Sequence, residues 1–150
     1  MAWRAVTEDD LLTRMSGDEL AALRESSLGT GQSDPVSEHI DQVTEMVRGY
    51  IAAHSANTLG ESGTLPERLI RPACDILVMD VSTRSGGILI DISDTRKTAH
   101  DNAVRLLEQV AQGNYAVEQP ETAGDDSEAA PSPSLYERTR NFEHSDQEGI

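Results

Sequence analysis

The feature that most constrains the fold is a stripe of apolar residues between positions 35 and 53. An aspartate and a proline, Asp34-Pro35, precede the stripe, and this pair is typical of a helix start. The apolar residues recur at spacings of three and four, and they are Val36, Ile40, Val43, Val47, Tyr50 and Ile51. A helix with one apolar stripe is stable when that stripe packs against other elements. The sequence therefore predicts a helix from 35 to about 53 inside a helical bundle.

The segment from 65 to 83 is apolar over most of a helical circumference, which predicts the central and most buried element. Pro72 lies inside it and lacks a backbone donor. Either the helix kinks at Pro72, or residues 66–71 form a separate turn and Pro72 starts the main helix. Asp75 and Asp80 interrupt the apolar run. Either they lie on an exposed edge of the helix, or each pairs with an arginine of a neighbouring helix or subunit.

Capping signals place the other helices. Thr7 is a helix cap followed by three acidic residues, which predicts a short helix to about Met15. Ser16 and Glu19 form a capping box, which predicts a second short helix to about Ser26. The last helix is expected to begin at Ser93 or Asp94 and to end at Gly113. Polar, glycine-containing loops are predicted at 28–33 and 55–64.

The segment Ile88-Leu89-Ile90-Asp91-Ile92 is β-prone and short. A strand of this length needs a partner, which a neighbouring subunit can supply, so Ile88, Ile90 and Ile92 are candidate inter-subunit residues. The predicted fold class is all-α: a small bundle of four to five helices, with a candidate short β-segment near 88–92 and an extended C-terminal tail.

Composition divides the chain into two parts. Residues 118–150 contain nine Asp or Glu against two Arg, a net charge of −7, together with three prolines. Such a composition is typical of disorder, so the predicted organisation is a helical domain at 1–117 and an acidic Pro/Ser-containing tail at 118–150. The domain carries the remaining −8 of the total charge of −15.

This acidity excludes ordinary nucleic-acid binding, because affinity for phosphates depends largely on Lys and Arg. Cys74 is the single cysteine, which favours an intracellular protein, and no apolar run is long enough to span a bilayer. The four histidines show no metal-ligand spacing, and no nucleophile and base can be paired. We therefore expect no metal, no cofactor, no signal peptide and no enzyme activity.

The end of the tail is not featureless. Leu135, Tyr136 and Phe142 lie among Arg138 and Arg140, so two of the five aromatic residues fall within eight positions. One interpretation is that these residues are scattered in a disordered end. The other is a docking segment that becomes ordered on a partner, where aromatic side chains supply contact area and arginines pair with carboxylates.

The order of several short motifs resembles the small helical neck proteins of tailed bacteriophages, the Mu-like head-tail adaptor family. The resemblance spans residues 3–115. An aromatic residue and two helix signatures open the pattern, a Gly-Tyr-Ile element and an Ala-Cys-Asp-Ile helix follow, and an Ala/Leu/Ala/Gly series closes it. The matching residues are Trp3, Thr7, Asp10, Leu11, Glu19, Leu20, Leu23, Gly49, Tyr50, Ile51, Ala73, Cys74, Asp75, Ile76, Ala103, Leu107, Ala111 and Gly113.

The resemblance implies a virion structural protein of the neck, at the head-tail interface, that passes through the host cytoplasm during assembly. It implies a homo-oligomeric ring of about twelve copies that contacts the portal protein and the tail or stopper proteins. DNA would pass through the ring without specific binding, because acidic side chains repel phosphates. The competing interpretation is a free acidic helical interaction module, such as a DNA mimic, a small chaperone or an antitoxin-like partner of a basic protein.

Overall fold

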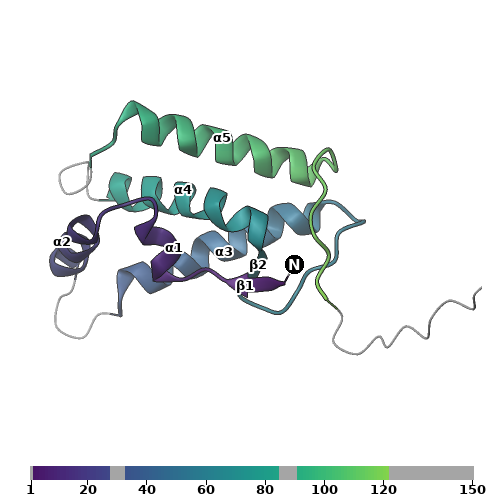
Figure 1. Cartoon of the computed structure of the whole chain (residues 1–150), viewed down its shortest axis with the longest axis horizontal. Coiled ribbons are helices and arrows are strands. Elements are labelled where there is room, and N and C mark those ends of the chain that lie inside the picture. The colour runs from purple at the N-terminus through teal and green to yellow at the C-terminus, as the bar shows by residue number, and fades with distance from the viewer. Residues whose placement is uncertain (1, 28–32, 85–90, 122–150) are drawn as a thin grey trace, which may run out of the picture.

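The computed structural model describes residues 2–27, 33–84 and 91–121. In these ranges five helices and one two-stranded sheet follow one another along the chain (Figure 1). Their bounds, in chain order, are β1 Trp3–Ala5, α1 Glu8–Leu12, α2 Gly17–Ser27, α3 Pro35–Ala53, β2 Thr64–Pro66, α4 Glu67–Arg84 and α5 Asp94–Ala111. The predicted fold class, a small helical bundle with a short β-segment, is confirmed.

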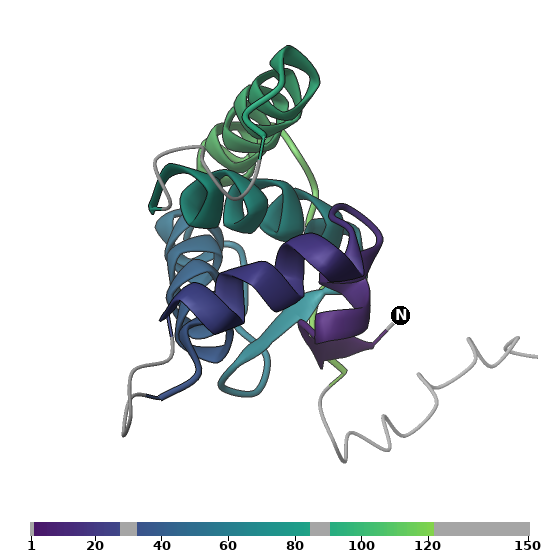
Figure 2. The same ribbon diagram turned by 90° about the vertical axis from the view of Figure 1, so that its left-hand side faces the viewer.

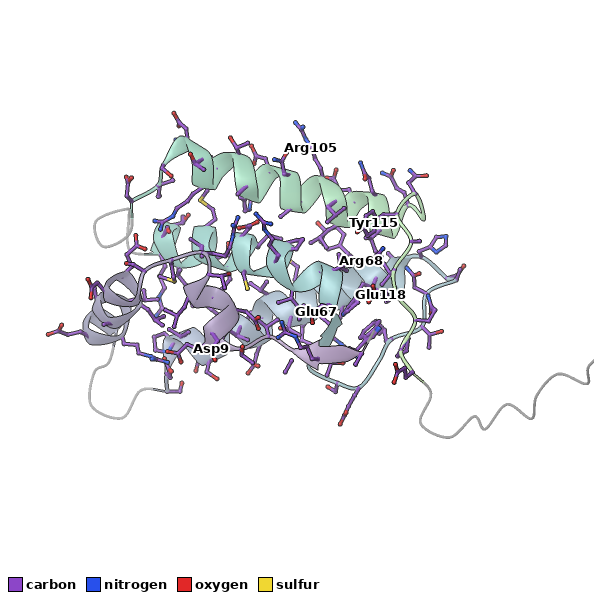
Figure 3. All side chains as sticks on the ribbon, in the orientation of Figure 1. Asp9, Glu67, Arg68, Arg105, Tyr115 and Glu118 are labelled. Carbon is purple, nitrogen blue, oxygen red and sulfur yellow. The ribbon has the colours of Figure 1, made fainter. Side chains whose placement is uncertain are left out.

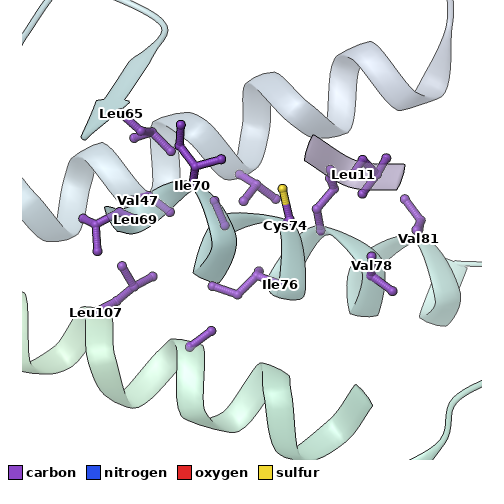
Figure 4. Close-up of a cluster of buried hydrophobic side chains, with 14 of the residues drawn as sticks. Leu11, Val47, Leu65, Leu69, Ile70, Cys74, Ile76, Val78, Val81 and Leu107 are labelled. Carbon is purple, nitrogen blue, oxygen red and sulfur yellow. The ribbon is translucent and has the colours of Figure 1, made fainter. Parts of the chain in front are cut away.

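Helix α4 is the centre of the bundle, as its apolar circumference predicted. It packs against α1, α3 and α5, so buried residues point from it toward several neighbours (Figures 2 and 4). These residues are Leu69, Ile70, Ala73, Cys74, Ile76, Leu77, Val78, Val81 and Ser82. Pro72 lies inside one continuous helix. The alternative in which Pro72 begins a separate main helix is therefore wrong.

Helix starts are confirmed at the predicted caps. The Thr7 side chain accepts a hydrogen bond from the Asp10 amide, and the Asp10 side chain accepts one from the Thr7 amide. Asp34 caps α3 with Pro35 in the first turn, and Ser93 caps α5. The first helix ends at Leu12, which is earlier than predicted, because the chain closes a turn through the hydrogen bonds of Thr13 and Arg14.

The observed sheet lies away from the predicted β-segment. β1 pairs antiparallel with β2, with Arg4 opposite Leu65. The Trp3 ring packs so closely on Gly60 that an added Cβ there would lie 2.6 Å from the ring atom Cε3. Glycine is therefore required in this loop. Asp91–Ser93 precede α5 without forming a strand, and residues 85–90 lie outside the described residues.

Candidate interaction surfaces

After α5 the chain turns back across the bundle, and we call residues 113–121 the strap (Figure 1). The indole Nε1 of Trp3 donates a hydrogen bond to the Glu118 carbonyl oxygen at 2.8 Å. Arg68 at the start of α4 lies 3.0 Å from the Glu118 carboxylate (Figure 3). The Thr58 amide donates to the Gln119 side chain at 2.9 Å. The strap therefore ties the base of the tail to β1, to α4 and to the loop after α3.

Gly113 makes the turn that starts the strap. Its φ is +77°, a conformation that favours glycine, and an added Cβ would collide with the His54 ring. The amides of Asn114 and Tyr115 both donate to the Gln109 carbonyl oxygen and close the end of α5. Gly113 was predicted as the helix terminator. The strap itself was not predicted, since its acidic residues and proline resemble the composition of the tail that follows.

Arginine side chains hold the short N-terminal helices onto the long ones. Arg4 of β1 bridges Asp10 of α1 and Glu67 of α4, at 2.7 and 2.6 Å. Arg24 of α2 likewise bridges Glu8 and Asp34, which caps α3. The Arg4 and Thr7 hydrogen bonds hold the pKa of Asp10 well below its usual range. Much of the basic charge of the domain is thus used internally.

Arg96 and Arg48 continue this pattern. Arg96 of α5 contacts both carboxylate oxygens of Glu19 in α2, at 2.9 and 3.0 Å, and it lowers the pKa of that carboxyl. Arg48 of α3 is buried, and it donates to the backbone carbonyl oxygens of Gly60, Glu61 and Thr64. Arg48 therefore holds the loop that leads into β2.

The outward face of α3 is acidic because its single arginine is buried. Glu38, Asp41 and Glu45 are exposed at intervals of three and four residues along α3. The Arg48 guanidinium lies 3.7 Å from Glu45 but points into the loop. Arg84 of α4 reaches the side of α3 at His39. No Lys or Arg of α3 is exposed, so this face presents negative charge to solvent.

A groove runs between α4 and α5, and we call it the α4–α5 groove. It consists of two adjoining hollows of about 240 and 360 Å³ that share Arg14, Asp75 and Ala99. Its small and apolar lining comprises Pro72, Ala99, Ala103 and Leu106, and four arginines also line it: Arg14, Arg68, Arg71 and Arg96. Arg71 is exposed and has no acidic partner among the described residues.

Four further polar or reactive side chains of α4 and α5 have distinct surroundings. Asp75 forms an ion pair with Arg14 from the α1–α2 link, whereas Asp80 is exposed on α4. Each of the two interpretations therefore holds for one aspartate. Cys74 is buried in the core, and burial raises the pKa of its thiol to about 12, so it packs rather than reacts. His100 lies beside Asp101 at 3.3 Å on the surface of α5.

Most of the predicted partner-binding residues lie outside the described ranges. Ile88 and Ile90 do so, as do Leu135, Tyr136, Arg138, Arg140 and Phe142. Ile92 is described and half-buried just before α5. Residues 2–27, 33–84 and 91–121 contain no group of His, Cys, Asp and Glu side chains that could hold a metal ion. None of their helices combines the length and apolar character needed to cross a bilayer.

Comparison with known proteins identifies the class. The model of a protein family described as Bacteriophage Mu, Gp36 matches residues 6–133, which include the whole bundle and the strap. The chain belongs to this family, and it is therefore a protein of a phage family. A search of curated proteins and a search of solved structures each found no match.

Proposed function

We propose that this chain is a virion structural protein of the phage neck, an adaptor that forms a ring between the portal and the tail. Its membership of the Bacteriophage Mu Gp36 family supports a phage protein, and the resemblance of its short motifs to neck proteins supports the neck. The proposed ring has about twelve copies, closes by rotation, and touches the portal on one side and tail or stopper proteins on the other. The proposed role is structural rather than catalytic.

The acidic face of α3 is the observation that supports the proposed passage of DNA through the ring. A ring around a duplex must not bind phosphates, and repulsion from carboxylates keeps the duplex free to slide. Glu38, Asp41 and Glu45 present such a surface without an exposed basic residue on the same helix. Helix α5, by contrast, mixes Asp101 with exposed Lys97 and Arg105. We therefore place the α3 face toward the lumen.

The neck assignment is tested by the composition of purified particles. A neck adaptor is present in a fixed number of copies per particle, and that number equals the ring stoichiometry seen by electron microscopy at the head-tail junction. Absence from particles would contradict the proposal. Stable association of the chain with a basic protein outside the particle would favour the free acidic interaction module.

The proposed orientation of the α3 face toward the lumen is tested by reversing charges on α3 and, as a control, on α5. Lysine at Glu38, Asp41 and Glu45 together should slow genome release from assembled particles, because the ring would then attract phosphates. The same charge change on α5, at Asp94, Asp101 and Glu108, is the control. Equal slowing by both variants would show that net charge matters and that α3 does not face the DNA.

The segment at Ile88, Ile90 and Ile92 remains a proposed inter-subunit contact. Ile92 is half-buried, and the described residues 91–93 form no strand pairing. Ile90→Pro would block strand addition by a neighbour, so it should prevent ring assembly while the helical content of the subunit is unchanged. Normal rings from this variant would contradict the contact.

A further inference from the structure

We propose that the α4–α5 groove is a docking site for an acidic segment of another phage protein, a segment that carries two carboxylates beside a small apolar side chain. This docking does not depend on where the chain lies in the particle, so it goes beyond the neck role proposed above. Three features support it: the lining of the groove, an arginine there without an acidic partner, and the negative charge of the surrounding surface.

The lining of the groove combines positive charge with an apolar floor. Four arginines and a single aspartate, Asp75, line its two hollows of about 240 and 360 Å³. This excess of positive charge occurs in a domain whose net charge is −8. Ala103 of the floor is buried, whereas Pro72, Ala99 and Leu106 are half-buried and so remain accessible from the hollows. A small apolar side chain of a partner can therefore pack there between charged groups.

Arg71 is the cation that the fold leaves for a partner. Arg14 and Arg96 already pair with carboxylates of their own chain. Arg71 is exposed and pairs with no acidic side chain of the described residues. Arg68 lies one helical turn before it on α4, and the Arg68 side chain is 60% exposed although it contacts Glu118. Two exposed guanidinium groups one turn apart match two carboxylates that are one turn apart on a partner helix.

The charge of the surrounding surface directs an acidic partner to the groove. Helix α3 presents Glu38, Asp41 and Glu45 to solvent, and residues 118–150 are acidic as well. Like charges that face one another across an interface repel, whereas opposite charges speed the encounter and fix its orientation. A segment rich in carboxylates is therefore repelled by the α3 face and by the tail, and it is attracted to the arginines between α4 and α5.

The tail of the same chain does not have the chemistry or the position of this partner. Figure 1 shows the strap leaving the end of α5 and passing β1, and the described chain ends beyond β1 at Glu121. The candidate docking residues of the tail include Arg138 and Arg140, which the arginines of the groove repel. The occupant that fits the groove is therefore a segment of a different protein.

The test introduces Arg71→Glu into the phage genome and measures the yield of infectious particles. Arg71 is exposed, so the purified variant should melt like wild type. The yield should fall about tenfold or more, because the new carboxylate repels the partner. Arg71→Lys keeps the positive charge and should lose much less. Arg105→Glu is the matched control: it makes the same charge change on the outer side of α5, and its yield should stay near that of wild type (Figure 3).

Second-site suppressors of Arg71→Glu identify the partner. We expect them in the gene of one other phage protein, where they replace an Asp or Glu by a neutral or basic residue. Wild-type yield from Arg71→Glu, or an equal loss from Arg71→Lys, would overturn the proposal. Suppressors confined to this chain would also overturn it, since the occupant would then be its own tail or a second copy. Particle composition is measured separately, so the neck assignment can stand or fall independently of this result.

Discussion

At the scale of single residues, buried arginine has a structural role that its charge does not suggest. Arg48 lies in the core side of α3 with its guanidinium on three backbone carbonyl oxygens. Two of these carbonyl groups, of Gly60 and Glu61, belong to the loop before β2, and the third belongs to Thr64 at the start of β2. The sequence pattern of α3 places position 48 beside Val47 and Ile51, but it does not show which loop returns to it.

Arg48→Met should lower the free energy of unfolding by about 2–4 kcal/mol, because it removes three hydrogen bonds from a charged donor to part-buried carbonyl oxygens. Urea denaturation followed by circular dichroism measures this change. Arg105→Met is the control, since Arg105 is exposed on α5 and such substitutions usually change stability by less than about 0.5 kcal/mol. Equal stability of the two variants would show that the Arg48 hydrogen bonds contribute little.

Leu77 tests the assignment of the core. It is 1% exposed on α4, so Leu77→Asp would bury an unpaired carboxylate and should destabilise the fold by several kcal/mol, about 4 or more. We expect an insoluble or unfolded chain. Leu12→Asp, at a leucine 41% exposed on α1, should remain soluble with cooperative unfolding. A Leu77→Asp protein that melts like wild type would contradict the assigned buried face.

At the scale of elements, local sequence signals were sufficient to predict the helices. They were insufficient to predict the short strands and the arginine bridges that connect the helices. Thr7, Ser16, Asp34 and Ser93 each act within three residues of themselves, so the sequence shows their roles directly. The β1–β2 pair has three-residue strands about 60 positions apart, which leaves almost no periodic signal. The arginine bridges, like Arg96 to Glu19 across 77 positions, depend on the tertiary fold.

The Arg4–Asp10 bridge between β1 and α1 should make stability depend on acid. The pKa of Asp10 is lowered in the fold from its ordinary value of 3.8, so its contribution is present above that pH and is lost as pH falls further. Asp10→Asn should lower stability at neutral pH by about 1 kcal/mol, a modest value because the Arg4 side chain is 39% exposed. The gap from wild type should narrow below pH 3.8, as urea midpoints measured across pH will show.

Asp9→Asn supplies the control for this series. Asp9 is exposed in the same helical turn and has no basic partner among the described residues (Figure 3). Its replacement should leave the pH dependence of stability unchanged. A pH-independent gap between Asp10→Asn and wild type would show that the bridge is not the source of the effect.

At the scale of the whole molecule, the strap shows where the folded body gives way to the tail. Composition placed acidic residues from 118 onward in one class, yet Glu118 and Gln119 contact β1, α4 and the loop after α3. Composition is an average over a whole segment, so it does not show that two residues within the segment are held by tertiary contacts. The candidate partner-binding residues of the tail were predicted from their aromatic clustering alone, whereas the groove between α4 and α5 required the fold.

Two truncations separate the strap from the tail. A chain ending at Glu121 should keep wild-type stability and bind portal rings poorly, with Tyr136→Ala and Phe142→Ala each giving part of that loss. A chain ending at Val117 should in addition lose about 1–3 kcal/mol, because it lacks the Glu118 and Gln119 contacts. Thermal melts and portal-ring binding measure the two properties. Wild-type portal binding by the shorter chains would show that the tail is a passive appendage.

The hydrogen bond between Trp3 and Glu118 also sets the order in which a newly made chain can be completed. It joins positions 115 residues apart, so the first strand leaves the ribosome long before its last partner is made. The N-terminal strand must therefore wait for β2 and then for the strap. Trp3 is the only tryptophan of the chain, and its indole acquires this environment only when the strap has docked. Its fluorescence should therefore report the docking of the strap on β1.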